Sequence, residues 1–93
     1  MFDFNKDVIQ EGDNVITTFK GNKIVLKNIY FYDGPITLQY LPFGGVQAVF
    51  NDVMIINTKN GFIATKEVEY DGFLYSVAEI SFLYNFVNTV LPN

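Results

Sequence analysis

Short runs of β-branched and aromatic residues alternate with turn-forming residues along most of the chain. Turn signals such as Gly21-Asn22, Asp33-Gly34-Pro35 and Asn60-Gly61 recur every 8 to 12 residues or roughly so, a spacing typical of meanders, barrels and sandwiches. The segments between the turns have the composition of strands. They are residues 13–20, 23–32, 36–41, 46–50, 53–58 and 62–70. The pattern therefore predicts six short antiparallel strands.

Three of these segments carry further information about burial and bending. Residues 53–56 are apolar at every position, which predicts a central strand covered on both faces. Residues 36–41 alternate apolar and polar side chains, as a half-buried strand does. In 23–32 the apolar side chains change from even to odd positions at Lys27-Asn28, and this change predicts a bulge or bend.

Two tight hairpins are predicted by dipeptides that favour a positive φ, Gly21-Asn22 and Asn60-Gly61. If Asn60-Gly61 forms the two-residue loop, Ile56 lies opposite Thr65. The hairpin prediction thus includes a register that a structure can test.

The hydrophobic period changes near the C-terminus. Ser76 and Glu79 have the S-x-x-E spacing of a capping box, which marks the start of a helix. Apolar residues then follow at helical intervals: Val77, Ile80, Tyr84, Val87 and Leu91. We predict a helix over residues 77–90 that covers the exposed face of the central strand.

Together these elements predict one domain over residues 1–93, mainly β (α+β) in class. The expected architecture is a small antiparallel β-barrel or a curved six-stranded sheet with one C-terminal α-helix. No linker, repeat or low-complexity tract divides the chain.

Composition adds an expectation about the surface. Of the 93 residues 49% are hydrophobic and only 17% are charged, which excludes a disordered chain. So few charged groups leave apolar surface for a protein partner or for self-association as a homodimer or higher oligomer. The net charge of −4 opposes binding to nucleic acid and to anionic membranes, so neither is expected as a partner.

The missing residue types exclude several kinds of chemistry. The chain has no His, Cys or Trp, and all six of its cationic side chains are lysines. Thiolate nucleophiles, imidazole bases and the usual zinc or iron–sulfur ligands are therefore absent. We expect a non-enzymatic protein without a catalytic residue, cofactor or metal site.

The start of the chain has neither the basic nor the apolar region of a secretory signal, so a cytoplasmic location is expected. Abundant Lys, Asn, Ile, Phe and Tyr fit the codons of an AT-rich genome, such as that of a low-GC bacterium or its phage.

Three aromatic side chains are candidate contacts for a partner. Phe43 lies in a predicted loop tip, next to Gly44-Gly45, where an aromatic side chain does not have to be buried in the core. Phe82 and Phe86 widen the apolar arc of the predicted helix beyond one packing face. The alternative for all three is ordinary burial against the sheet.

Two groups of charged residues are weaker candidates. Lys20, Lys23 and Lys27 surround the first hairpin turn and could contact an anion or a phosphate-bearing ligand, or else keep that edge soluble. Glu67 and Glu69 lie two apart on a strand, so their carboxylates share a face and could hold a cation or act as an acid and base pair. The alternative for this pair is protection of a solvent-facing edge.

A second set of aromatic side chains, Tyr30-Phe31-Tyr32, places rings on both faces of a strand end. Such rings can stack on a base, and the alternative is a core cluster.

These observations favour a small protein-interaction module, such as a phage or mobile-element inhibitor or regulator of a host protein. The alternatives are a structural subunit of a homo-oligomeric or virion assembly and a small-molecule-binding β-barrel.

Overall fold

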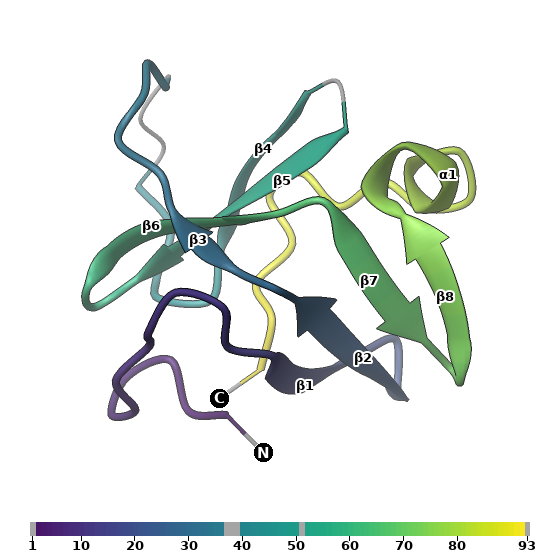
Figure 1. The fold of residues 1–93 in the computed structure, drawn as a ribbon, viewed down its shortest axis with the longest axis horizontal. Helices are drawn as coiled ribbons and strands as arrows, with labels where there is room; N and C mark the ends of the chain where they lie inside the picture. Colours follow the sequence, from purple (N-terminus) through teal and green to yellow (C-terminus); the bar gives the residue numbers. More distant parts are fainter. Residues whose placement is uncertain (1, 37–39, 51, 93) are drawn as a thin grey trace.

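The computed structural model describes residues 2–36, 40–50 and 52–92. These residues form eight strands and one short helix, with the strands in two four-stranded antiparallel sheets (Figure 1). Sheet A has the order β1 (Val15–Phe19), β2 (Asn22–Lys27), β7 (Glu67–Tyr70) and β8 (Phe73–Ser76). Sheet B has the order β3 (Tyr30–Phe31), β6 (Gly61–Thr65), β5 (Val53–Thr58) and β4 (Val46–Phe50). The helix α1 (Val77–Ser81) directly follows β8.

The predicted mainly β class with one C-terminal helix is confirmed. The six predicted strands become eight because segments 23–32 and 62–70 each divide, residues 73–76 form a further strand, and the described positions of segment 36–41 form none. No strand pairing among the described residues joins sheet A to sheet B. Neither a closed barrel nor a single six-stranded sheet is therefore confirmed.

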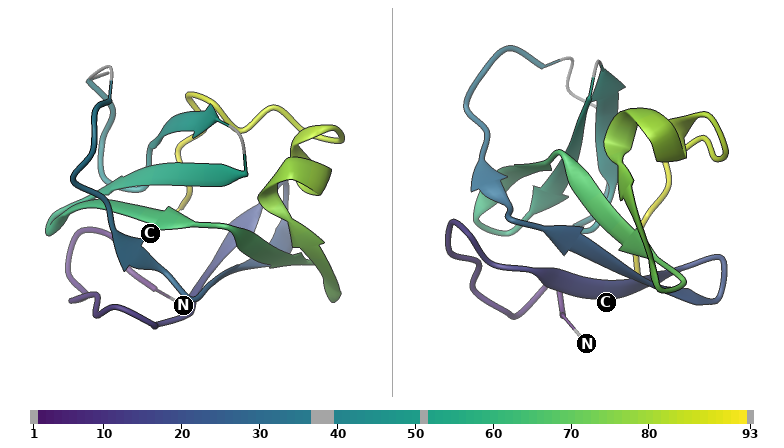
Figure 2. Two further views of the ribbon diagram at one scale, coloured as in Figure 1. Left: turned by 45° about the horizontal axis from the view of Figure 1, so that its top comes forward. Right: turned by 45° about the vertical axis from the view of Figure 1, so that its right-hand side comes forward.

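The two divided segments are the places where the chain changes sheets (Figure 2). Asn28, with a φ of 48°, separates β2 from β3, so the predicted bend at Lys27-Asn28 is confirmed. Lys66 separates β6 from β7 in the same way. The buried Thr65 Oγ1 lies 2.7 Å from the carbonyl oxygen of Lys27 and 2.9 Å from that of Glu67. One hydroxyl thus links the two corners, the points at which the chain passes from one sheet to the other.

The register predicted for the hairpin at Asn60-Gly61 is wrong by two residues. The loop consists of Lys59-Asn60, and Thr58 pairs with Gly61. Ile56 consequently lies opposite Ile63, although every side chain keeps its predicted face. The Thr58 hydroxyl accepts a hydrogen bond from the Asn60 N–H at 3.2 Å and donates to the Gly61 carbonyl at 2.7 Å. This side-chain bonding favours the earlier loop.

Two further hairpins have two-residue loops with a positive φ at both positions, the geometry of a type I′ turn. In Lys20-Gly21 the φ angles are 52° and 81°, and in Asp71-Gly72 they are 51° and 85°. The first loop begins one residue before the predicted Gly21-Asn22, because Asn22 already pairs with Phe19.

The C-terminal helix begins where predicted and ends much earlier. The Ser76 Oγ accepts from the Glu79 N–H at 3.0 Å, and the Glu79 carboxylate accepts from the Ser76 N–H at 2.8 Å. This confirms the capping box. The helix ends at Ser81 instead of residue 90.

The chain beyond the helix returns along β4 in an extended course, which explains the early end. The Val46 N–H donates to the Thr89 carbonyl at 2.7 Å, and the Asn88 N–H donates to the Val46 carbonyl at 3.0 Å. β-Branched residues are common in this stretch, and Asn88 has a φ of 69°. Asparagine side chains compete with helical hydrogen bonds, as the Asn85 carboxamide does by accepting from the Val87 N–H.

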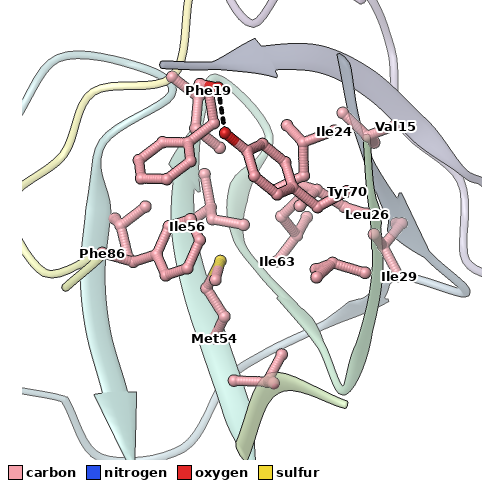
Figure 3. Packing of buried hydrophobic residues seen from close by; sticks show 14 of the residues in the cluster. Val15, Phe19, Ile24, Leu26, Ile29, Met54, Ile56, Ile63, Tyr70 and Phe86 are labelled. Carbon is pink, nitrogen blue, oxygen red and sulfur yellow. Dashed lines mark hydrogen bonds between the residues drawn. The ribbon is translucent and has the colours of Figure 1, made fainter. Parts of the chain in front are cut away.

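The main core lies between the two sheets (Figure 3). The rings of Phe19 and Phe86 lie 4.4 Å apart between centroids, and the Tyr70 hydroxyl donates to the Phe19 carbonyl at 3.0 Å. Phe86 therefore reaches the core from the extended tail and not from a helix. The other members with fully buried side chains include Phe4, Ile24, Leu26, Ile29, Met54, Ile56, Ile63, Ile80 and Leu91.

Strand β5 is the predicted central strand, with both neighbours paired and Met54, Ile55 and Ile56 fully buried. The helix does not cover the face that carries Ile55, because Val77 and Ile80 belong to the main core on the other face. Leu41, in the loop before β4, approaches that side instead: the Asn57 carboxamide donates to the Leu41 carbonyl at 2.9 Å.

Of the half-buried strand predicted over residues 36–41, positions 37–39 lie outside the described residues. Ile36, Tyr40 and Leu41 are not in a strand, and Tyr40 is fully exposed. The predicted strand is therefore not found at the positions that the structure describes.

Candidate functional site

The three candidate aromatic residues occupy different environments. Phe86 is 1% exposed and packs in the core, so it is not accessible to a partner. Phe82 follows the helix and is 91% exposed. Phe43 is exposed in the loop before β4. This loop and α1 lie on opposite sides of the view in Figure 1. Phe43 and Phe82 consequently do not share a surface.

The glycine pair beside Phe43 has a role within the chain. Gly44 has a φ of 94°, and a Cβ atom there would collide with the Leu91 carbonyl oxygen. The Leu91 N–H donates to the Gly44 carbonyl at 2.8 Å. The close approach that these glycines permit is therefore made by the C-terminal tail.

The three candidate lysines do not converge on one point. Lys20 is in the hairpin loop, whereas Lys23 and Lys27 lie near opposite ends of β2, about 13 Å apart at the usual rise of a strand. Lys27 lies directly opposite Glu67 on β7. The arrangement is a line of cations beside a line of carboxylates and does not form an anion cradle.

Glu67 and Glu69 occupy the same face of β7, as their spacing predicts. Among residues 2–36, 40–50 and 52–92, no three acidic side chains gather in a group that could hold a metal ion. The early lysines and the later carboxylates belong to neighbouring strands, so the charges are not separated across the molecule.

Four exposed apolar side chains lie on β8 and at the end of α1, two elements that contact each other (Figure 2). Phe73 and Leu74 on β8 are 67% and 61% exposed, and Leu83 beside Phe82 is also 61% exposed. We call Phe73, Leu74, Phe82 and Leu83 the apolar edge. Sequence reasoning identified Phe82 and missed the two β8 residues, although Asp71-Gly72 before them is a hairpin signal.

A shallow depression of about 280 Å³ adjoins the apolar edge. It is lined by Val49, Ala78, Ser81 and Phe82. The Ser81 Oγ is buried without a hydrogen-bond partner in the described part of the chain. With mostly apolar walls, the depression has the size and character to receive a side chain of a bound protein.

A row of side chains crosses the outer face of sheet A and ends at the apolar edge. Register pairs place Ile16, Val25, Glu69 and Leu74 side by side on β1, β2, β7 and β8. The row joins two exposed apolar side chains at opposite edges of the sheet, with a carboxylate next to Leu74.

The carboxylate of Glu79 lies at the far end of β8 and is fully exposed. Hydrogen bonds from the backbone N–H and the side chain of Ser76 lower the pKa of Glu79 below its ordinary value. The end of β8 next to the helix therefore keeps a negative charge at neutral pH.

A second depression, of about 460 Å³, lies along β4. Its lining includes Pro35, Ile36, Gln47, Phe50 and Val87. None of the described residues that line it is ionisable.

Within the described residues, no helix is long and apolar enough to cross a membrane. Comparison of the chain with models of protein families, with curated proteins and with solved structures finds no match.

Proposed function

We propose that this chain is a small, non-enzymatic protein-interaction module that binds a partner protein through the apolar edge. The observation that carries the proposal is the exposure of Phe82, at 91%, beside Leu83 at 61%. Phe73 and Leu74 on the contacting strand β8 are exposed as well. None of these four side chains belongs to the hydrophobic core of the described residues. Aromatic side chains with a neighbouring depression are frequent anchors of protein interfaces.

Composition supports the non-enzymatic part of the proposal. The chain offers neither imidazole nor thiol, and its six cations are lysines. The proposed setting is the cytoplasm of a low-GC bacterium, where a phage-encoded protein of this size would inhibit or regulate a host protein. Nucleic acid and membrane are not proposed as partners, because the net charge is −4.

Affinity purification from the cells that produce the chain tests the proposal. Three tagged forms are compared by quantitative mass spectrometry: the unchanged chain, a Phe82→Ser/Leu83→Ser double variant and a Val8→Ser control. Val8 is 67% exposed. It belongs to the N-terminal segment, which lies on the other side of the view from β8 and α1 in Figure 1. The amount of a co-purified partner that binds the apolar edge should fall about tenfold or more with the double variant and should stay constant with the control.

Sedimentation velocity of the three purified forms separates the remaining alternatives. A defined homo-oligomer that the double variant abolishes would favour a structural subunit. If the chain is monomeric and no co-purifying protein depends on Phe82 and Leu83, the proposed function is wrong.

A further inference from the structure

We propose that the free edge of β8 accepts an extended, lysine- or arginine-containing segment of the partner as a fifth strand of sheet A. This inference rests on the proposed function and specifies the chemistry of the partner. Strand addition to an open sheet edge is a general mode of peptide recognition, in which backbone hydrogen bonds supply affinity and side chains supply specificity.

The β7–β8 hairpin determines which backbone groups are free. Because Tyr70 and Phe73 flank a two-residue loop, they form the pair that exchanges both hydrogen bonds. Donation from the Val77 N–H to the Lys66 carbonyl, at 2.8 Å, continues the same alternation. The N–H and C=O of Leu74 therefore point away from β7, toward the open edge.

The far end of the edge is closed by the capping box. The Ser76 N–H points in the same direction as that of Leu74, but it donates to the Glu79 carboxylate at 2.8 Å. Leu74 is thus the central residue of the open edge, and an added strand must place one residue directly opposite it. In an antiparallel arrangement these two residues exchange both hydrogen bonds.

Side chains around Leu74 define the centre of the added strand. Leu74 is 61% exposed on the outer face and Phe73 is 67% exposed on the inner face. No charge or proline protects these positions, in contrast to most edge strands. Apolar residues opposite Leu74 and on either side of it would cover both side chains.

Carboxylates define the flanks of the added strand. Asp71 and Glu79 lie beyond the two ends of β8, and Glu67 lies opposite Ser76 on β7. Positions two residues on either side of the central residue share its face and come nearest to these groups. Lysine or arginine at these positions would lie near carboxylates of opposite charge. The sequence that fits the edge is therefore three apolar residues with a basic residue on either side.

The same charges disfavour a second copy of the chain. If two β8 strands paired antiparallel about Leu74, Ser76 of one copy would lie opposite Gly72 of the other. Glu79 beside Ser76 would then approach Asp71 beside Gly72 at both ends of the contact. Like charges in register destabilise such a pair, whereas a basic segment is attracted.

Nuclear magnetic resonance with defined peptides tests this inference on the intact chain. The probe is the blocked peptide Ser-Lys-Val-Val-Val-Lys-Ser, whose palindromic pattern fits either strand direction. One control replaces both lysines of the peptide with glutamate, and another methylates the backbone nitrogen of the central valine. The basic peptide should bind about tenfold or more tightly than either control and should slow exchange of the Leu74 amide proton.

Two protein variants locate the binding. Leu74→Lys places a cation on the open edge and should weaken binding of the basic peptide about tenfold or more. Ile16→Lys adds the same charge in the same cross-strand row at the opposite edge of sheet A and should change binding less than about twofold.

Three results would overturn the inference. They are binding without protection of the Leu74 amide, equal binding of the acidic and basic peptides, and a homodimer that Leu74→Lys dissociates. Absence of peptide binding, combined with a partner that still depends on Phe82 and Leu83, would reject the added strand and leave the proposed function in place.

Discussion

The Thr65 hydroxyl contacts the Lys27 carbonyl oxygen at 2.7 Å, although 38 positions separate the two residues in the chain. Lys27 ends β2 where the chain leaves sheet A, and Thr65 ends β6 where the chain leaves sheet B. The same hydroxyl also reaches the Glu67 carbonyl at 2.9 Å. The relative placement of the sheets therefore depends on a buried polar contact as well as on apolar packing.

Removal of this hydroxyl should destabilise the fold. Thr65→Val keeps the side-chain shape but leaves two corner carbonyls without their shared donor, so unfolding in urea should require about 1–3 kcal/mol less free energy. Thr65→Ser retains the hydroxyl and should lose less. Equal stability of the valine variant and the unchanged chain would contradict the role given to Thr65.

Truncation of Phe86 should destabilise the fold strongly, whereas truncation of Phe82 should leave its stability nearly unchanged. Phe86→Ala removes a ring that is 1% exposed and should lower the free energy of unfolding by about 3–5 kcal/mol. Phe82→Ala removes a ring that is 91% exposed and should change it by less than about 0.5 kcal/mol. Urea titrations followed by circular dichroism measure both. A large loss for Phe82 would show that it is part of the folded core.

The capping box should make stability depend on pH. Because the folded-state pKa of Glu79 is lowered, the carboxylate stabilises the fold above its unfolded-state pKa and loses this effect as the pH falls through the folded-state value. The Glu79→Gln variant has no charge at this position at any pH. The difference in thermal midpoint between the two proteins should be largest near pH 7 and should shrink between about pH 5 and about pH 3. A difference that does not vary with pH would argue against the carboxylate.

The parity of apolar residues was sufficient to predict one of the two points at which the chain changes sheets and gave no sign of the other. At Lys27-Asn28 the change from even to odd apolar positions marks the passage from β2 to β3. Around Lys66 the sequence has no such change, because Phe62, Ala64, Val68 and Tyr70 all stand at even positions. Only burial in the structure changes there, from Ile63 and Thr65 to Val68 and Tyr70. The prediction of one strand over 62–70 missed this because β-branched and aromatic content is high on both sides of Lys66.

The predicted helix over 77–90 shows where local patterns fail. Ile80 and Leu91 are both buried, as the helical spacing predicts. Leu91, however, is buried from the extended tail and not from a helix. Hydrogen bonds between the tail and Val46 outweigh a weak helical preference near Asn85 and Asn88. Such long-range pairing is not encoded in periodicity.

The candidate site was predictable only in part. Phe82 follows from an apolar arc wider than one packing face, whereas Phe86 has the same pattern and lies in the core. Phe73 and Leu74 were hidden in what reads as one apolar stretch from residue 73 onward, and only strand order shows that β8 is an edge.

The most direct test of binding through the apolar edge is site-specific photo-crosslinking in the cells that produce the chain. A benzophenone amino acid is placed at Phe82 in one form and at Val8 in another, both of which are well exposed. If a partner binds the apolar edge, position 82 gives a discrete crosslinked protein that position 8 does not give. Equal crosslinking from both positions, or none from position 82, would contradict binding through the apolar edge.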